Sequence, residues 1–313
     1  MFRKEKCCVM EKKISGKLTT ADITFNVLNY AFFIIFTLIC IYPFYYLIIN
    51  TISANDLSAN GGIVFVPKGV HFQNYINVIK IKGLGTAIWI SVLRTVIGTI
   101  CTVLASAFLG FMFTQQKMWG RSIWYRTIVI TMYFNAGLIP LFLTMKNLHL
   151  TNNFWVYVIP MIVQPFNIIL VKTYVESIPS SLQEAAEIDG AGIITVFRKI
   201  ILPTCKPILA TIAIFSAVGQ WNSFNDTLIY VTEQKLYSLQ YLLYCYINQA
   251  NSLMALINNT AGTGTNLMLL ANQQTPTSVR MTVTVIAMLP ILCVYPAFQR
   301  YFVKGIMIGS VKG

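Results

Sequence analysis

Six long runs of apolar residues constrain the fold of this chain more than any other feature of its sequence. A helix needs roughly 20 apolar residues to cross the hydrocarbon core of a bilayer. Within lipid a spanning segment must satisfy its own backbone hydrogen bonds, which favours helices. We therefore expect an all-α polytopic membrane protein with six transmembrane helices, at about residues 25–49, 86–113, 124–145, 154–176, 207–230 and 281–302.

The composition supports this class of protein. Of the 313 residues, 56% are hydrophobic and 11% are charged, whereas a soluble domain carries about 25% charged residues. The net charge of +13 does not indicate a nucleic-acid partner, because most Lys and Arg residues lie between or beside the apolar runs. We expect a membrane domain over 25–303, between an N-terminal segment at 1–24 and a tail at 304–313.

The basic residues predict an orientation, because cytoplasmic loops of membrane proteins carry an excess of Lys and Arg. Six spans would put both termini on one side. The basic residues on that side are Arg3, Lys4, Lys6, Lys12, Lys13, Lys17, Lys117, Arg121, Arg126, Lys172, Arg198, Lys199, Lys206, Arg300, Lys304 and Lys312. Those on the other side are Lys68, Lys80, Lys82, Lys146, Lys235 and Arg280. Both termini and the loop 177–206 are therefore expected in the cytoplasm, and the polar segments 50–85 and 231–279 outside.

The sequence offers no pattern typical of a catalytic or metal site. The seven cysteines have no metal-ligand spacing, and several lie inside apolar runs, where Cys behaves as a small hydrophobe. His71 and His149 are isolated in predicted outer loops. Gly262-Thr-Gly264-Thr is not followed by the Gly-Lys-Ser/Thr of a phosphate-binding loop. We expect no catalytic residue, no metal and no cofactor in this chain.

The loop at 177–206 predicts two short helices joined by a sharp bend. Ser181 and Glu184 have capping-box spacing, so a helix is expected to start there. Asp189-Gly190 is a turn signal, and a second helix at about 193–201 would end before Pro203. An amphipathic helix that simply lies on the lipid surface is the alternative interpretation.

This loop also carries a specific motif: Glu-Ala-Ala, three residues, Gly, nine residues, then Ile-x-Leu-Pro. The residues at its fixed positions are Glu184, Ala185, Ala186, Gly190, Ile200, Leu202 and Pro203. The pattern resembles the cytoplasmic signature of ABC importer permeases. The C-terminal stretch 295–313 resembles that of maltose-type carbohydrate permeases. Within that group the chain most resembles the branch that imports complex oligosaccharides in Gram-positive bacteria, as seen in Gln220-Trp221-Asn222 and in the long segment after it.

The resemblance implies a type I ABC importer permease in a bacterial cell membrane, working within a larger complex. A second, different permease subunit would complete the pore, and an extracytoplasmic solute-binding lipoprotein would deliver an oligosaccharide derived from plant or host polysaccharide. Two ATPase subunits would bind ATP and Mg²⁺. Coupling to the ATPase would run through 181–203, by the motif residues together with Asp189. The tail residues Gly309, Ser310, Val311, Lys312 and Gly313 would reach the ATPase interface, although a frayed tail fits equally.

Polar residues inside the predicted spans are candidates for the substrate pathway. Arg94 would line the pathway, or it would have a structural role by snorkelling outward or by pairing, and the structural interpretation is favoured. Asn222, Asn225 and Asp226 lie beside Trp221, and amides next to aromatic rings suit a sugar. Hydrogen bonding between packed helices is the alternative for this cluster.

Two further functions remain open from the residues. One is an ABC permease for another solute, such as a peptide or glycerol phosphate. The other is a polytopic membrane scaffold or enzyme without an ATPase, against which the 184–203 motif argues.

Overall fold

The computed structural model describes residues 20–134, 136–259, 275 and 277–293, and within these ranges the chain is helical and contains no strand. Two helices are long and apolar enough to cross a membrane alone, α1 (Thr20–Thr51) and α4 (Leu84–Met112). Two bent pairs pass the same test when each is taken as one span, Phe154–Met161 with Pro165–Glu176 and Ile193–Thr204 with Lys206–Asn222. The described residues therefore hold two to four candidate spans, and a count of six stays a prediction.

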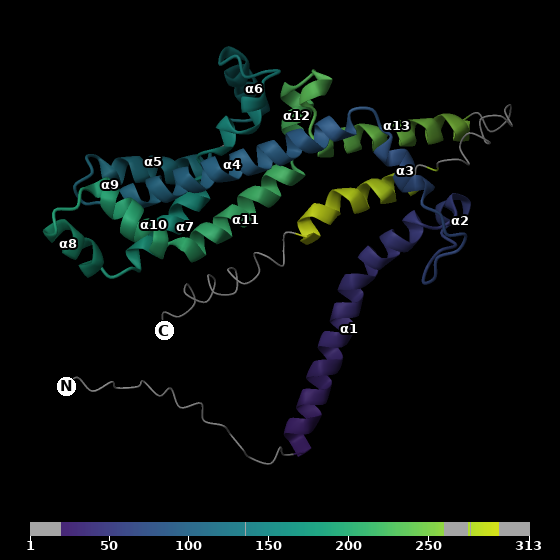
Figure 1. The fold of residues 1–313 in the computed structure, drawn as a ribbon, viewed down its shortest axis with the longest axis horizontal. Helices are drawn as coiled ribbons and strands as arrows, with labels where there is room; N and C mark the ends of the chain where they lie inside the picture. Colours follow the sequence, from purple (N-terminus) through teal and green to yellow (C-terminus); the bar gives the residue numbers. More distant parts are fainter. Residues whose placement is uncertain (1–19, 135, 260–274, 276, 294–313) are drawn as a thin grey trace.

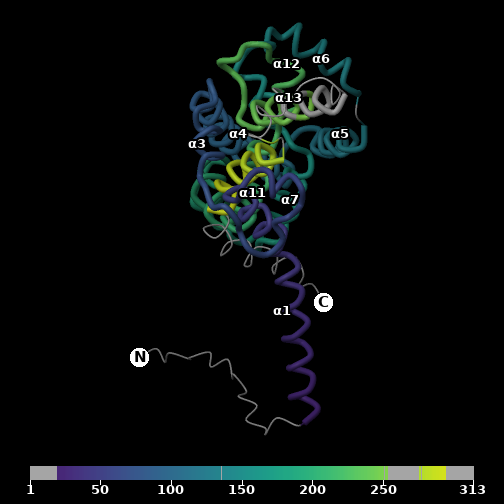
Figure 2. The backbone as a smooth tube through the Cα atoms, turned by 90° about the vertical axis from the view of Figure 1, so that its right-hand side faces the viewer, coloured from purple at the N-terminus to yellow at the C-terminus, as the bar shows by residue number. Residues whose placement is uncertain are grey.

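Helix α1 stands apart from the body of the molecule and contacts it only near its C-terminal end (Figures 1 and 2). Ile49, Asn50 and Thr51 are buried there, while the rest of the helix exposes large apolar side chains. The Asn50 amide donates to the Ile63 carbonyl at 3.3 Å, and the Ser58 hydroxyl donates to Asn50 Oδ1 at 2.8 Å. These bonds attach α1 to the segment that holds α2 (Asn55–Ala59) and α3 (Gln73–Ile79).

The body is built around α4, which packs along α11 (Lys206–Asn222) and α7 (Pro165–Glu176) (Figure 1). Two glycines of α4 allow this close approach. A Cβ at Gly98 would stand 2.6 Å from Gln220 Nε2 of α11, and one at Gly110 would stand 2.7 Å from Val171 Cβ of α7. Small residues at such contacts are how membrane helices bring their backbones together.

Three of the predicted spans are broken rather than continuous. The run 124–145 divides into α5 (Arg121–Tyr133) and α6 (Leu138–Asn147), and Gly137 between them has φ +88°. The run 207–230 ends its main helix at Asn222, passes through extended backbone at Ser223 and resumes as α12 (Asn225–Tyr230). For these two runs the expectation of one continuous helix is wrong.

The fourth predicted span begins as two short 3₁₀ helices, η1 (Phe154–Tyr157) and η2 (Ile159–Met161), before α7. Pro160 and Pro165 lie at helix starts, where a missing N–H costs nothing, but each prevents a single helix from running through. An apolar run indicates that a segment is buried or contacts lipid, but it does not indicate whether its helix is continuous or broken.

The polar segment 231–279 contains η4 (Gln234–Leu236) and the helix α13 (Leu239–Asn259). The last predicted span corresponds to a helix at Thr277–Cys293, and its predicted end at 302 lies outside the described residues. The segment 1–19 and the tail residues Gly309–Gly313 also lie outside them.

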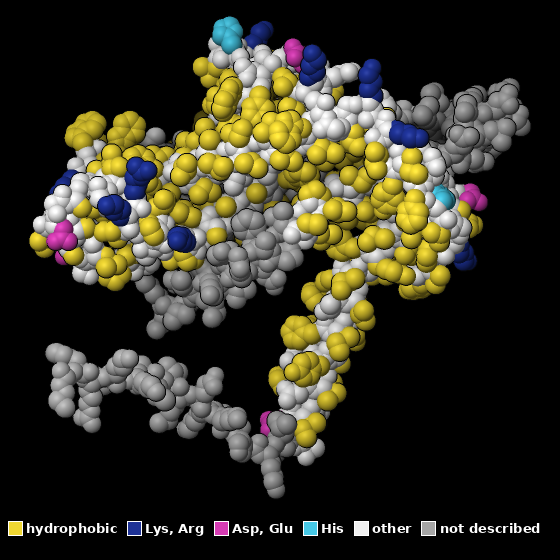
Figure 3. All heavy atoms as spheres, in the orientation of Figure 1, with side chains coloured by type: hydrophobic (Ala, Val, Ile, Leu, Met, Phe, Trp, Pro, Cys, Tyr) yellow, Lys and Arg dark blue, Asp and Glu magenta, His cyan; other side chains and the backbone are white. Residues whose placement is uncertain are grey.

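Large apolar side chains cover much of the surface in addition to filling the interior (Figure 3). The interior holds three buried clusters. One joins the C-terminal ends of α4 and α7 to the 196–212 stretch, one surrounds Tyr157 and Tyr230, and one surrounds Trp221. A protein that faces lipid needs an apolar surface over its long helices, because the interior of the bilayer is as apolar as the interior of the protein.

Candidate functional site

The motif segment folds as two short helices with a bend, as the sequence predicts. The first is α8 (Ser181–Ile188), and the second is a continuous helical stretch of α9 (Ile193–Val196), a π-helical turn η3 (Phe197–Ile201) and α10 (Leu202–Thr204). The expected end of the second helix before Pro203 is wrong, because the stretch passes from the π-helical turn through Pro203 to Thr204. The expected capping box is wrong in detail. Ser181 is the first helical residue, and Ser180 before it takes the N-cap position without a side-chain cap bond.

Gly190 has a clear structural role at the end of α8. Its φ is +80°, a left-handed conformation that favours glycine. The Gly190 N–H donates to the Glu187 carbonyl at 3.0 Å, and the Ala191 N–H donates to the Ala186 carbonyl at 2.9 Å. This pair of bonds is the Schellman motif, which ends a helix and reverses the chain. The glycine of the motif therefore sets the direction in which the next helix leaves α8.

The other motif residues fall into two groups. Glu184, Ala185 and Asp189 are exposed on α8, as is Pro203 on α10. Ala186, Ile200 and Leu202 are half-buried and pack against the apolar cluster around Phe111 of α4. The second group fixes the segment to the body, and the first leaves one side of α8 available to a partner.

Sequence reasoning missed Ile188, which is 86% exposed at the end of α8. Leu182 and Ala185 precede it at intervals of three residues and are also exposed, so the three share one side of the helix. We call them the α8 apolar strip. In the sequence itself, the recurrence of apolar residues at every third position, 182, 185 and 188, was a signal for this strip.

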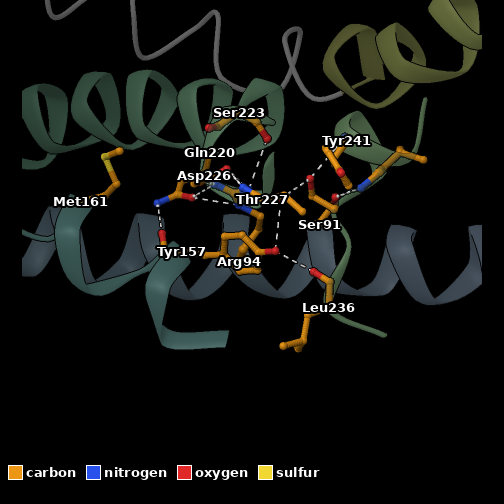
Figure 4. A network of polar contacts seen from close by, with 12 residues as sticks. Ser91, Arg94, Tyr157, Met161, Gln220, Ser223, Asp226, Thr227, Leu236 and Tyr241 are labelled. Carbon is orange, nitrogen blue, oxygen red and sulfur yellow. Dashed lines mark hydrogen bonds and ion pairs between the residues drawn. The ribbon is translucent and has the colours of Figure 1, made fainter. Parts of the chain in front are cut away.

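Within the bundle, Arg94 of α4 is 1% exposed and fully paired (Figure 4). It forms an ion pair with Asp226 of α12, with one Nη1–Oδ1 distance of 3.1 Å. Its Nε and Nη2 also donate to Gln220 Oε1 at 3.2 and 3.1 Å, and Nη1 donates to the Ser223 carbonyl at 3.3 Å. The guanidinium has five N–H donors, and these contacts account for all of them.

The contacts continue outward from this pair. The Arg94 guanidinium lies over the Tyr157 ring, 4.4 Å from its centroid. Gln220 Nε2 donates to the Tyr157 carbonyl at 3.1 Å, and the Tyr157 hydroxyl donates to the Leu236 carbonyl at 2.7 Å. The Thr227 hydroxyl bonds the Tyr157 hydroxyl at 3.2 Å. One buried network thus joins α4, η1, α11, α12 and the segment before α13, across the break at Ser223 (Figure 4).

The five predicted pathway residues do not form one site. Arg94 and Asp226 pair with each other, which agrees with the structural interpretation favoured for Arg94. Trp221 is buried, and its Nε1 donates to the Ala287 carbonyl at 3.1 Å. It lines a separate apolar hollow of about 340 Å³ between α4, α11 and the 277–293 helix. Asn222 and Asn225 are exposed beside the break in the chain.

A cavity of about 290 Å³ lies on the other side of α11, between α4, η2 and α7. Amide, hydroxyl, aromatic and thioether side chains line it, and its lining residues are Arg94, Thr102, Met161, Gln164, Phe166, Asn167, Phe215, Ser216, Gly219, Gln220 and Ser223. Because Arg94 is saturated, the lining presents mainly neutral hydrogen-bonding groups beside Phe166 and Phe215. Groups of three or more potential metal ligands are absent from the described part of the chain.

Comparisons with known proteins assign the family. Residues 102–308 match the family model described as "Binding-protein-dependent transport system inner membrane component". The chain is 32% identical to the polygalacturonan/rhamnogalacturonan transport system permease protein YtcP of Bacillus subtilis (strain 168), over 92% of this chain and 98% of that protein. It is 34% identical to Protein LplC of the same organism, over 94% and 97% of the two chains.

A solved structure agrees with this assignment. The crystal structure of a bacterial ABC transporter involved in the import of the acidic polysaccharide alginate includes a chain with 28% sequence identity and a TM-score of 0.77. The match covers 92% of this chain and all of that chain. The chain therefore belongs to the family of inner membrane components of binding-protein-dependent transport systems, and it is a membrane permease rather than an enzyme.

Proposed function

We propose that this chain is one permease subunit of an ATP-driven importer that moves an oligosaccharide into the cytoplasm. The observation that carries the proposal is the placement of the motif helix relative to the cavity. Helix α8 lies between α7 and α11 in the chain, and both of those helices line the cavity with amide, hydroxyl and phenyl groups. A movement of α8 would therefore reach the cavity wall through α7, which precedes it in the chain, and through α9, η3 and α10, which lead to α11.

The proposed partner of α8 is a separate ATPase subunit that binds ATP and Mg²⁺. The α8 apolar strip is suited to a groove, because amphipathic helices dock by apolar residues repeated at three or four positions. Ala185 allows close approach, and Glu184 and Asp189 flank the strip with negative charge. This arrangement requires α8 in the cytoplasm, as the distribution of basic residues predicts. The tail Gly309–Gly313 is proposed to add a second ATPase contact.

The proposed cargo is a plant- or host-derived oligosaccharide. Neutral amides and hydroxyls match sugar hydroxyls, and aromatic rings match apolar sugar faces. We assign contact with the sugar to Gln164, Asn167, Phe166 and Phe215 of the cavity. Arg94, which Asp226 holds in place, shapes its wall. The names of YtcP and of two AraQ arabinooligosaccharide permeases, together with the alginate importer, support a polysaccharide-derived cargo. The exposed amides of Asn222 and Asn225 are secondary candidates for contact.

The proposed complex contains this chain, a second and different permease, two ATPase subunits and a solute-binding lipoprotein outside the membrane. The chain itself would cross the bacterial cell membrane six times, with both termini in the cytoplasm. Lys117 pairs with Glu187 of α8 at 2.7 Å, and Arg198 and Lys199 lie in η3 of the same motif segment. This concentration of basic residues at the motif segment supports the proposed orientation.

Co-purification with the ATPase tests the coupling part of the proposal. Tagged wild-type chain is expected to retain its ATPase subunit through detergent extraction, and Ile188→Asp is expected to lose most of it, because a charge in an apolar groove is unfavourable. Ser181→Ala, at an exposed hydroxyl in the first turn of α8, is the matched control and should behave as wild type. Equal ATPase recovery with Ile188→Asp and with the control would contradict α8 docking.

A further inference from the structure

We infer that the loop at 113–120, between α4 and α5, is a brace that transmits the movement of α8 directly to α4. Lys117 and Gln115 are its positioning residues, and Phe197 of η3 adds a separate contact with α4. The inference rests on the proposed docking of an ATPase on α8, and it adds a second mechanical connection to the covalent one through α9, η3, α10 and α11.

Two side-chain contacts attach α8 to this loop. Lys117 Nζ lies 2.7 Å from Glu187 Oε2, and Gln115 Nε2 donates to Gln183 Oε1 at 3.2 Å. Gln183 and Glu187 are four residues apart and so share one side of α8. At about 100° per residue, this side is opposite the α8 apolar strip. The helix is therefore held from behind while its apolar strip faces away from the body.

An aromatic contact attaches the following helix to α4 as well. The Phe197 ring, at the start of η3, packs edge-on to Phe108 and stacked on Phe111, with both centroid distances at 5.5 Å. Ala186 of α8 packs against the same cluster. The motif segment thus packs against α4 through Phe197 after its bend at Gly190, and before the bend it joins the same apolar cluster through Ala186.

The loop itself is closely bonded to α4. The Thr114 N–H and hydroxyl both bond the Phe111 carbonyl, at 2.9 and 2.6 Å, and the Gln115 N–H donates to the Met112 carbonyl at 3.1 Å. Arg121 Nη1 then donates to the Thr114 carbonyl at 3.1 Å. Because these bonds continue the end of α4, a displacement of Gln115 or Lys117 is delivered to the helix rather than absorbed by a loose loop.

Helix α4 is the straighter of the two routes to the cavity. The covalent route from α8 passes a π-helical turn and a 78° bend before α11. By contrast, α4 is unbroken from Leu84 to Met112 and carries Thr102 and Arg94 on the cavity wall. Arg94 in turn holds Asp226 beyond the break in the chain. The brace therefore links the proposed ATPase contact to the cavity wall at Thr102 and Arg94, and through Arg94 to Asp226.

A charge swap tests the brace in the complete importer reconstituted in vesicles with its ATPase, partner permease and binding protein. Lys117→Glu and Glu187→Lys each place like charges together, and the double variant restores an opposite pair in the same place. We expect each single variant to lower oligosaccharide uptake per ATP hydrolysed at least threefold, while ATPase co-purification stays unchanged. We expect the double variant to return within twofold of wild type. Lys206→Glu reverses an exposed charge outside the brace and is expected to match wild type.

The result distinguishes this inference from the proposed function. If Ile188→Asp abolishes ATPase recovery while both single variants match wild type, docking stands and the brace is wrong. The brace is also wrong if the double variant stays as low as the single variants. If Ile188→Asp retains the ATPase and full uptake, the proposed docking itself is wrong, and the brace falls with it.

Discussion

Arg94 and Asp226, 132 residues apart, form a buried ion pair that joins α4 to α12 across a break in the helix between them. Two charges inside a membrane domain are unfavourable unless each is paired and hydrogen-bonded. Gln220, Ser223 and Tyr157 supply the remaining contacts of the guanidinium. The pair therefore fixes the short helix α12 against the bundle, and its Arg94 contributes to one wall of the cavity.

Loss of one partner in this pair should destabilise the protein more than loss of both. Arg94→Met or Asp226→Leu alone leaves an uncompensated buried charge, and we expect each to cost about 3–5 kcal/mol. The double variant removes both charges and should recover most of that loss. Thermal unfolding of the purified chain in detergent measures this. Equal losses in the single and double variants would mean that the two residues do not act as a pair.

The close approach of α4 and α7 predicts a strong effect at Gly110. A Cβ there would stand 2.7 Å from Val171 Cβ and 3.1 Å from the Ile168 carbonyl, so Gly110→Ala should destabilise by about 1–3 kcal/mol. Val171→Ala in the same chain should recover part of the loss. Gly85→Ala is the matched control on α4, because nothing lies within 4 Å of its Cβ position. A Gly110→Ala variant as stable as the control would contradict this packing.

At Gly190 the expected effect comes from the backbone alone. Nothing lies within 4 Å of a Cβ at this position, but φ is +80°, and the left-handed region disfavours alanine by about 1–2 kcal/mol. Gly190→Ala should therefore change the exit direction from α8 and reduce ATPase recovery, whereas Gly190→Asn should be milder, because Asn tolerates this conformation. Gly192→Ala, at ordinary φ and in open space, serves as control. Recovery that is the same for all three variants would remove the role assigned to the bend.

The cavity predicts which substitutions alter sugar affinity. Loss of a single hydrogen bond is worth about 0.5–1.5 kcal/mol, so Asn167→Ala should raise the oligosaccharide concentration for half-maximal uptake by about 2–10-fold. Basal ATP hydrolysis should not change. Thr95→Val is the control, since its buried hydroxyl has no hydrogen-bond partner among the described residues and it lines the apolar hollow instead. If Thr95→Val raises that concentration and Asn167→Ala does not, the sugar contacts the apolar hollow on the opposite side of α11, and the assignment of sugar binding to the cavity is wrong.

The sequence predicted the parts of this fold that depend on local pattern. The apolar runs located α1 and α4 to within a few residues of their ends, and Ser181 and Gly190 located the start of α8 and the bend after it. These features depend on helix propensity, turn residues and contact with lipid, all of which neighbouring residues determine. Pro203 did not end the second helix, which continues through it to Thr204.

The breaks and the long-range contacts were not predictable in the same way. An apolar run looks the same in the sequence whether its helix is continuous or broken. Two of the runs contain breaks, at Gly137 and at Ser223. The partners of Arg94 depend on how α11 and α12 fold back, which spacing along the chain does not report. For the same reason the sequence placed Trp221 and Asp226 in one site. In the structure Trp221 lines the apolar hollow, whereas Asp226 of α12 pairs with Arg94.

Uptake of a labelled oligosaccharide by vesicles that hold the complete importer tests the central claim most directly. With ATP on the ATPase side and loaded binding protein on the other, a polysaccharide-derived oligosaccharide is expected to accumulate above its external concentration, and Ile188→Asp should abolish the accumulation. Accumulation that proceeds equally without ATP, or with Ile188→Asp, would contradict an ATP-driven permease coupled through α8.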